Sequence, residues 1–459
     1  MTSEPGSSNH GLGKNPLTVH AHVKEAYRRY YDSAFWLRDA KLLAERRSLL
    51  EQHGTMTQEP LLEAVPVYPS VKAIDEACKE AGLGAFATEH LGTVVFGSGP
   101  GIKLRDHQAK SLVYALSGDE EGRKNVVVTS GTGSGKTESF LLPLIARLLD
   151  ERASARSPGE LNPWWEKDLG RNDRTWKPAR LDGVGSVEPA VRALVMYPTN
   201  ALVEDQVVRL RKAAVRAAAI HGKPLFYFGR YTGSTWGGTT DVSGALDAST
   251  RGTINKVAGQ VRKIERERRE LEQAMSERGE SSDSIAEVLG QVHDPRCGEL
   301  LTRWDMIWGL PDILITNTSM LNVMLMRREE ENLFAKTREW LDNDPDAVFS
   351  LVVDELHSYR GTQGTEVALV VRNLLDRLGL EADSPKLRCI ATSASLDGEE
   401  GRNYLEEFFG TRGNSFTIMP GSPSTPSAEL PLEPGKVDAL VAAAVSADED
   451  ALKEAASSL

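Results

Sequence analysis

The chain has 459 residues, of which 40% are hydrophobic and 26% are charged, and its formal net charge is -12. This balance is typical of a globular protein and excludes a disordered chain, and no apolar stretch approaches the roughly 20 residues that span a membrane. Because the N-terminus also lacks the apolar core of a secretion signal, we expect a cytoplasmic protein with no membrane partner. Its three cysteines are scattered without metal-site spacing, which argues against a zinc cluster.

The negative net charge weighs mildly against a nucleic-acid partner, because phosphate-binding proteins usually present a basic surface. Loop N–H groups and helix N-termini nevertheless bind phosphates without contributing to net charge. Nucleic acid therefore stays a candidate partner.

In chain order, residues 1–18 are polar and rich in Gly and Ser, and we expect them to be disordered. Residues 19–90 predict an accessory helical segment, because apolar and aromatic residues recur at helical spacing as far as His53, with Gly54 as a C-cap. Beyond Leu104, short apolar runs alternate with helical stretches. The runs cover residues 125–128, 192–197, 225–231, 312–316, 349–353 and 387–391. This alternation predicts an α/β fold with a doubly wound parallel sheet, in a domain of about residues 91–420.

Two insertions interrupt this domain, at about residues 153–187 and 236–305. The first holds Trp164, Trp165 and Trp176 and predicts a long loop packed by its own aromatic side chains. The second predicts a helical arm, because apolar residues alternate spacings of three and four between Ile254 and Met275. The pattern is too short for a dimeric coiled coil, so we expect the arm to fold back on its own domain. After a last strand at 416–419, residues 421–459 predict a linker and an acidic C-terminal helix.

A glycine-rich segment between a predicted strand and a predicted helix is the strongest chemical signal. It consists of Ser130, Gly131, Thr132, Gly133, Ser134, Gly135, Lys136 and Thr137. Small residues let successive backbone N–H groups surround phosphates, Lys136 can reach the β- and γ-phosphates, and the Thr137 hydroxyl can bind Mg²⁺. The segment therefore predicts a binding site for ATP and Mg²⁺.

A second motif, Asp354-Glu355-Leu356-His357, follows the apolar run 349–353. Asp354 can hold the Mg²⁺ shell, and Glu355 can polarise the water that attacks the γ-phosphate. Three further runs end in small polar clusters, at residues 198–202, 316–321 and 392–395. Since ligands bind outside the carboxyl ends of parallel strands, we expect all these residues at one edge of the sheet.

These motifs, in this order, resemble the motif series of superfamily 2 DExH-box helicases over roughly residues 104–396. Motif I corresponds to residues 130–137, motif Ia to 198–202 and motif Ib to 316–321. Motif II corresponds to the DELH box at 354–357, and motif III to residues 393–395. The segment Leu104-Arg105-Asp106-His107-Gln108 and the long insertion resemble the MrfA/YprA-type helicases and large defence-associated helicases. The expected fold is thus a RecA-like domain.

The resemblance implies roles for further residues. Gln108 reads the adenine edge, and His357 couples hydrolysis to strand movement together with Ser393 and Ser395. The residues that face nucleic-acid phosphates are Thr199, Asn200, Thr232, Gly233, Thr318 and Ser319. Motif III reads Ser-Ala-Ser where the family usually has Ser-Ala-Thr, which keeps a hydroxyl. Single-stranded DNA is the expected partner. The sequence does not decide between DNA and RNA, the direction of translocation, or a role in DNA repair or phage defence.

In this superfamily a second RecA-like domain supplies the arginines that stabilise the transferred phosphoryl group, and no segment resembling that domain follows Ser395. We expect it to come from a missing C-terminal portion or from a partner chain. Without it, this chain should bind nucleotide and hydrolyse it slowly, since an arginine finger contributes about 10³ to 10⁵ in rate. The alternatives are a nucleic-acid-binding module that uses ATP only as a ligand, a truncated inactive fragment of a larger helicase, and a P-loop protein of another class. The sequence lacks the further signatures that P-loop proteins of other classes need.

Overall fold

The computed structural model describes residues 16–52, 54–58, 67–131, 133–153, 158–183, 186–424, 434–446 and 449–458. The chain forms two compact units, one of Val67–Ser424 and one of Met1–Pro66 with Thr425–Leu459. Disorder was expected for residues 1–18: residues 1–15 lie outside the described residues, and residues 16–18 are instead the start of helix α1 (Pro16–Ala34). Of the linker expected from residue 421, residues 425–433 lie outside the described residues. None of the described helices is long and apolar enough to cross a membrane.

An eight-stranded sheet forms the centre of the larger unit, and every neighbouring pair of its strands is parallel. In spatial order the strands are β12 (Phe416–Pro420), β3 (Asn125–Thr129), β11 (Leu387–Ser393), β10 (Phe349–Val353), β6 (Ala193–Tyr197), β9 (Ile313–Asn317), β7 (Phe228–Tyr231) and β8 (Glu299–Leu300). The predicted doubly wound parallel sheet is confirmed. The edge strand β8 has only two residues, too few for a recognisable apolar run.

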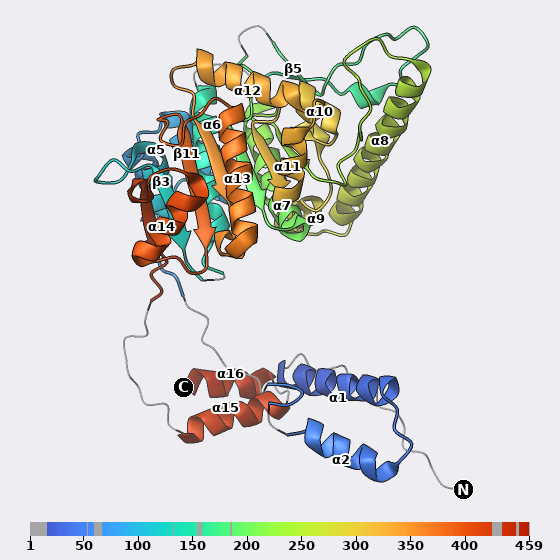
Figure 1. Cartoon of the computed structure of the whole chain (residues 1–459), viewed down its shortest axis with the longest axis vertical. Helices are drawn as coiled ribbons and strands as arrows, with labels where there is room; N and C mark the ends of the chain where they lie inside the picture. Colours follow the sequence, from blue (N-terminus) through green and yellow to red (C-terminus); the bar gives the residue numbers. More distant parts are fainter. Residues whose placement is uncertain are drawn as a thin grey trace. The chain divides into compact units, whose positions relative to one another are not determined.

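Two hydrophobic cores cover the two faces of this sheet, because successive side chains of a strand point to opposite faces. In β6, Leu194 and Met196 join one core, while Val195 and Tyr197 join the other. The second core includes residues of α3 (Ile74–Glu80), α4 (Ala85–Phe96), α5 (Asp106–Ser117), α6 (Lys136–Ala153) and α7 (Asn200–His221). The first includes residues of α10 (Arg303–Trp308), α11 (Thr318–Met326), α12 (Glu331–Asn343), α13 (Gly361–Arg377) and α14 (Gly398–Phe409). Figure 1 shows these helices against the strands.

The first insertion is held by its tryptophans, as predicted, and also by a residue from outside it. Trp164 contacts Trp165 and Trp176 edge to face, and Trp176 contacts Trp304 of α10 in the same way. The Nε1 of Trp164 donates to buried Asp305 at 3.0 Å. The insertion also contains the short antiparallel pair β4 (Glu160–Leu161) and β5 (Arg180–Leu181).

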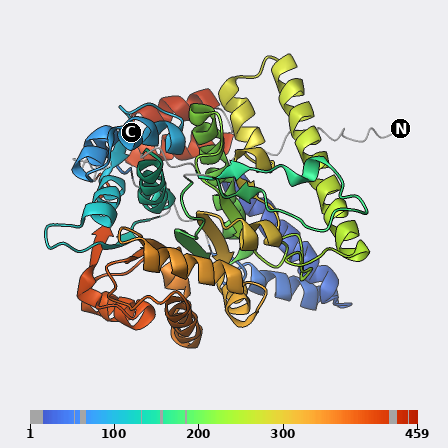
Figure 2. The ribbon, with the colours of Figure 1, turned by 90° about the horizontal axis from the view of Figure 1, so that it is seen from above.

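The second insertion forms the predicted helical arm, α8 (Ala248–Glu277), followed by α9 (Ser282–Leu289). The arm folds back on its own unit, since Ile254, Val257 and Val261 are buried in the core of one sheet face. Figures 1 and 2 show α8 on the side of the larger unit opposite β3. Arg268, which interrupts the apolar pattern, donates to the carbonyls of Leu289 and Val292. Arg268, the residue that breaks the pattern, therefore caps the C-terminal end of α9.

The smaller unit contains α1 (Pro16–Ala34), α2 (Ala40–Leu50), α15 (Pro434–Ser446) and α16 (Glu449–Ser458). Asp39 begins α2 by accepting the N–H groups of residues 41 and 42, and Glu51 is its C-cap. The sequence-based C-cap at Gly54 is therefore wrong, although Gly54 does adopt a positive φ of 76°. Helices α3 and α4, which the sequence placed in the accessory segment, lie instead in the larger unit. The expected single C-terminal helix is two helices.

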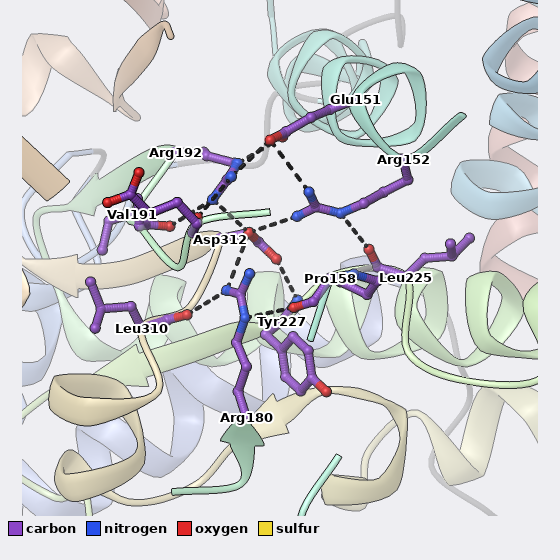
Figure 3. A network of polar contacts seen from close by, with 12 residues as sticks. Glu151, Arg152, Pro158, Arg180, Val191, Arg192, Leu225, Tyr227, Leu310 and Asp312 are labelled. Carbon is purple, nitrogen blue, oxygen red and sulfur yellow. Dashed lines mark hydrogen bonds and ion pairs between the residues drawn. The ribbon is translucent and has the colours of Figure 1, made fainter. Parts of the chain in front are cut away.

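A buried carboxylate, Asp312, joins several elements at the amino end of the sheet (Figure 3). Its Oδ1 accepts from Arg152 of α6 and from Arg192 before β6, each at 3.0 Å, and from Arg180 of β5 at 3.3 Å. Its Oδ2 accepts the N–H of Tyr227 at 2.9 Å. Burial opposes its ionisation, but the three guanidinium groups outweigh burial and lower the pKa of Asp312.

The same contacts explain why β7 begins three residues later than predicted. The N–H of Tyr227 is bound by the Asp312 side chain, and its carbonyl accepts from the N–H groups of Asp312 and Ile313. A second carboxylate, Glu151, accepts from Arg192 at 2.7 Å. Two carboxylates thus compensate three buried guanidinium groups, and the position tolerates little change in charge.

We predict that Asp312→Asn lowers the free energy of unfolding by about 3–5 kcal/mol, because it leaves buried guanidinium groups uncompensated. Urea unfolding of the purified chain measures this loss. Lys336→Ala is the matched control: Lys336 pairs with Glu339 at 2.6 Å with both side chains about half exposed, and should cost at most about 1 kcal/mol. Equal losses in the two variants would contradict the role given to Asp312.

Candidate functional site

Six adjacent strands bring the residues singled out in the sequence to one edge of the sheet. The glycine-rich loop follows β3, Ser393 ends β11, Asp354 follows β10, and the other clusters follow β6, β9 and β7. The strand ends lie in register: Thr129 pairs with Ser393, and Tyr197 with Asn317. The glycine-rich loop and the carboxylates therefore occupy one half of the edge, and the hydroxyl-rich clusters occupy the other half.

The glycine-rich loop adopts a conformation that its glycines permit. Gly133 and Gly135 have φ angles of 73° and 77°. A Cβ on Gly135 would lie 2.3 Å from the Nε2 of Gln108, so a larger residue would displace the Gln108 side chain. The hydroxyls of Ser130 and Ser134 are 2.5 Å apart within the loop. Thr132 lies outside the described residues.

Helix α5 supports this loop from outside. His107 Nε2 is 2.8 Å from the carbonyl oxygen of Ser134. Gln108 Oε1 accepts the N–H of Arg105 at 3.0 Å, and its Nε2 donates to the Gly135 carbonyl at 3.2 Å. The buried Gln108 amide keeps one further N–H and one further lone pair. Tyr68 completes the support, since its hydroxyl accepts the N–H of Gly131 at 3.1 Å.

Lys136 and the carboxylates of residues 354 and 355 lie together. Lys136 Nζ is 3.5 Å from Glu355 Oε1. The Thr392 hydroxyl donates to Asp354 Oδ1 and accepts the N–H of Glu355 at 3.1 Å, so β11 positions both acids. Burial raises the pKa of Asp354 in spite of the Thr392 hydrogen bond. A cation beside Asp354 would offset this cost of burying a charge.

The available donors fit Mg²⁺ bound together with a nucleotide. Mg²⁺ prefers oxygen ligands and usually takes one or two from a protein and the rest from water and phosphates. The candidates are the Asp354 carboxylate and the Thr137 hydroxyl, which accepts from Gln206 Nε2 at 3.3 Å. Among the described residues, no group of three or more His, Cys, Asp or Glu is arranged to hold a metal ion. A metal site made only of such side chains is therefore not available in that part of the chain.

A cavity of about 510 Å³ lies over the glycine-rich loop. The residues predicted from sequence that line it are Gln108, Gly133, Gly135, Lys136, Thr137 and Glu355. Arg105 and Arg209 line it as well. Arg105 was singled out only as part of the segment 104–108, without a role of its own, and Arg209 was not singled out. Arg105 Nη1 donates to the Gly133 carbonyl at 2.8 Å, and Arg209 pairs with Glu138. Arg209 carries no local signal, because only the packing of α7 brings it to the cavity.

His357 connects the acidic motif to the loop after β11. Its Nδ1 accepts the N–H of Ala394 at 3.1 Å and lies 3.3 Å from Glu355 Oε2. Ser393 is buried, and its Oγ lies 3.4 Å from the carbonyl oxygen of Ser395. The Ser395 hydroxyl accepts from Arg360 at 3.2 Å. The three predicted coupling residues are thus brought together beside Glu355.

The other half of the edge presents polar groups from β6 and β9. Thr199 is exposed before α7, and Ser319 is exposed in the first turn of α11 beside half-buried Thr318. Asn200 Oδ1 accepts from Asn317 Nδ2 at 2.6 Å, which joins the two strand ends. Asn317 also caps α11 by accepting the N–H of residue 320. Its role was missed, although it lies within the recognised cluster.

The end of β7 differs from the expectation for Thr232. Its side chain is buried, with 2% exposure, and its hydroxyl is 3.0 Å from that of Ser234. Gly233 and Ser234 are exposed, and a Cβ on Gly233 would meet no atom within 4 Å. The surface hydroxyl at this position therefore belongs to Ser234.

Comparison with known proteins gives two sequence matches. Residues 105–227 match the family model described as DEAD/DEAH box helicase. The Druantia protein DruE of Escherichia coli (strain UMEA 4076-1) is 32% identical over 469 aligned positions, which cover 91% of this chain and 23% of DruE. The chain thus spans less than a quarter of the length of this curated relative.

Two solved structures resemble the chain at lower identity. The DUF1998 helicase MrfA bound to DNA has 16% identity and a TM-score of 0.41, over 84% of this chain and 35% of MrfA. The Mycobacterium smegmatis helicase Lhr bound to single-stranded DNA and AMP-PNP has 19% identity and a TM-score of 0.39, over 75% of this chain and 28% of Lhr. In this chain a glycine-rich loop follows β3, a strand inside the eight-stranded parallel sheet.

Glu355 has a left-handed backbone with a φ of 52°, which costs a non-glycine residue roughly 1–2 kcal/mol. We predict that Glu355→Gly is more stable than Glu355→Ala by about 1 kcal/mol. Both variants lose the carboxylate, so their difference isolates the backbone. Chemical unfolding of the two proteins measures it. The usual order, with alanine more stable than glycine, would contradict the strained conformation.

Proposed function

We propose that the chain carries a DEAD/DEAH box helicase domain, binds Mg-ATP and single-stranded DNA, and couples ATP hydrolysis to movement along the strand. The match of residues 105–227 to the DEAD/DEAH box helicase family model supports this proposal. One observation carries this proposal: a single sheet edge holds the nucleotide-type motifs on β3, β11 and β10 and the hydroxyl-rich clusters on β6, β9 and β7. Strands β10 and β6 are direct neighbours. A change at the acidic motif can therefore reach the strand-binding half through one shared ladder.

In the nucleotide half, backbone N–H groups of the glycine-rich loop and the start of α6 surround the phosphates. Lys136 then contacts the β- and γ-phosphates, while Thr137 and Asp354 hold Mg²⁺, which neutralises phosphate charge when bound. Glu355 orients the attacking water, since its carboxylate adjoins Lys136 in the same cavity. The free N–H and lone pair of Gln108 match the donor and acceptor of the adenine edge.

Coupling to the strand is assigned to His357 with Ser393 and Ser395. His357 lies between Glu355 and the N–H of Ala394, so a shift of the glutamate on hydrolysis changes the loop after β11. On the other half, exposed Thr199, Ser319 and Gly233 offer hydroxyl and N–H donors to phosphates. Such contacts position a strand without reading its bases.

Efficient turnover requires a further arginine from a second RecA-like domain, supplied by another part of the protein or by a partner chain. Arg105 and Arg209 line the nucleotide cavity of this chain, but each is already paired with its own loop or with Glu138. An alternative is a nucleic-acid-binding module in which ATP is only a ligand. The intact set of Lys136, Asp354 and Glu355 favours hydrolysis.

Lys136 and Glu355 separate nucleotide binding from turnover. We predict that Lys136→Ala abolishes the stabilisation of the chain by Mg-ATP in a thermal-shift assay, because the phosphates lose their side-chain cation. Glu355→Gln keeps this stabilisation and removes residual hydrolysis, which steady-state phosphate release with and without single-stranded DNA measures. An unchanged ATP shift in Lys136→Ala contradicts the phosphate assignment, and lost binding in Glu355→Gln makes that residue structural.

Thr199 and Thr318 test the strand-binding half. We predict that each alanine variant weakens single-stranded DNA binding about twofold to tenfold, the size of one hydrogen bond, with little regard to base sequence. Fluorescence anisotropy at fixed salt with strands of different composition measures the effect. Thr253→Ala is the control, because that hydroxyl bonds the Ser249 carbonyl within the arm. A strongly sequence-dependent loss would argue for base contacts instead.

A further inference from the structure

Helix α7 touches both halves of the functional edge. It begins at Asn200, directly after Thr199, in the half assigned to the nucleic-acid strand. Further along, Gln206 Nε2 donates to the hydroxyl of Thr137 in the first turn of α6, at 3.3 Å. Since a helix rises about 1.5 Å per residue, the backbones of Asn200 and Gln206 are roughly 9 Å apart along the axis. One short, rigid segment therefore joins the strand-binding half to a candidate Mg²⁺ ligand.

The side-chain amide of Gln206 is incompletely paired. Gln206 is 6% exposed, and its Nε2 makes two long hydrogen bonds, to Thr137 and to Asp205 Oδ2, both at 3.3 Å. No described residue donates to its buried Oε1. The Thr137 hydroxyl carries a hydrogen as well as lone pairs, so after a half-turn of the amide it can donate to Oε1. The two side chains therefore have two hydrogen-bonded arrangements, and the second gives Oε1 a partner.

The role proposed for Thr137 favours the second arrangement. A hydroxyl that shares a lone pair with Mg²⁺ becomes a weaker acceptor, and its hydrogen becomes a stronger donor. Oε1 of Gln206 is the unpaired acceptor beside this hydroxyl. Occupancy of the Mg-nucleotide site thus changes which atom of Gln206 faces Thr137, and it changes the constraint on α7.

A second contact holds α7 against α6 one helical turn further along. Arg209 pairs with Glu138, the residue after Thr137, and both line the nucleotide cavity. The ion pair also reduces the repulsion between the Glu138 carboxylate and bound phosphates. The two helices therefore stay in contact in both arrangements of Gln206, so that a change at Thr137 is carried into α7.

The other end of α7 is open towards the strand. Thr199 occupies the N-cap position and is exposed, and its side chain binds no N–H group of the described helix. The first N–H groups of α7 can therefore bind phosphate oxygens. Asn200 Oδ1 accepts from Asn317 Nδ2 at 2.6 Å, and Asn317 caps α11, which begins with Thr318 and Ser319. A movement of α7 thus reaches both predicted phosphate clusters.

We propose that Gln206 is a positioning residue that couples the Mg-nucleotide site to the strand site through α7. Thr137 and Gln206 form the nucleotide end of this link, and Thr199 and Asn200 form its strand end. The link rests on the proposed function for both ligands. It is a route separate from the contact of His357 with the loop after β11.

Gln206→Leu tests the link, because leucine has a similar volume and no polar side-chain atom. In the wild type, saturating Mg-AMPPNP should change the affinity for single-stranded DNA about fivefold or more, a usual size for coupling between two sites. Gln206→Leu should bring this ratio close to one and leave the affinity without nucleotide unchanged. Fluorescence anisotropy at fixed salt measures both affinities. A general loss of stability would weaken both and leave their ratio unchanged.

Two further variants complete the test. Gln273→Leu is the matched control and should behave as the wild type, because Gln273 Nε2 donates to Glu277 within the exposed part of the arm. Gln206→Glu keeps an acceptor opposite the Thr137 hydroxyl and should keep the ratio. Gln206→Met replaces Gln206→Leu if the leucine variant does not fold. A ratio near one in Gln206→Glu would overturn the accepting role of Oε1.

Hydrogen exchange follows the nucleotide end of the link without a strand. Mg-AMPPNP should slow amide exchange over residues 200–206 in the wild type and in Gln273→Leu. Gln206→Leu should not show this effect, although a thermal shift confirms that it binds Mg-AMPPNP. Slowing of the same size in Gln206→Leu, or none in the wild type, would overturn the link.

The affinity ratios separate the link from the proposed function. If Gln206→Leu has the same ratio as the wild type, the link is wrong and the proposed function stands. If the wild type binds both ligands with a ratio near one, the link and the proposed coupling are both wrong. A wild type that binds no strand overturns both as well.

Discussion

The buried Asp312 cluster is the interaction on which the geometry of the functional edge depends. It joins the starts of β6, β7 and β9 to the end of α6 and to the first insertion (Figure 3). Strands β6 and β9, which start at this cluster, each have five residues. Fixing the register at their amino ends therefore aligns their carboxyl ends, where a slip of one residue would turn every side chain to the other face.

Helix α6 transmits the same constraint to the nucleotide half. It begins at Lys136 in the glycine-rich loop and carries Arg152 in its last turn, where the guanidinium reaches Asp312. The loop is thus attached at one end to β3 and, through a helix of 18 residues, to the opposite edge of the sheet. The left-handed backbone of Glu355 is tolerated in this frame, because Thr392 binds the N–H of Glu355 and the carboxylate before it. Strained backbone residues are concentrated at functional sites, which agrees with the role proposed for Glu355.

The insertions add to the sheet rather than disturb it. The tryptophans of the first pack on Trp304, and the arm of the second returns to the same core, so both are held by α10 and its surroundings. The cavity over the glycine-rich loop is lined by no residue of either insertion. The sheet thus carries both insertions without a change at the edge that holds the glycine-rich loop.

The sequence by itself determined the features that depend on local order: the phosphate loop, the adjacent carboxylates, the alternation of strands and helices, and the arm. Backbone conformation and hydrophobic periodicity act over a few residues, which is why residues 130–137 and Ile254, Val257 and Val261 could be interpreted directly. All site assignments, including those to Lys136, Asp354 and Glu355, stay predictions, although the structure gathers these residues at one edge.

Only the tertiary structure decided which distant residues meet. Three features follow from strand order and packing: the cluster of Arg152, Arg180, Arg192 and Asp312, the approach of Arg209 to the cavity over the glycine-rich loop, and the burial of Thr232. Charge pairing and burial are properties of neighbours in space, and these neighbours lie tens of residues apart in the chain, so no local pattern marks them.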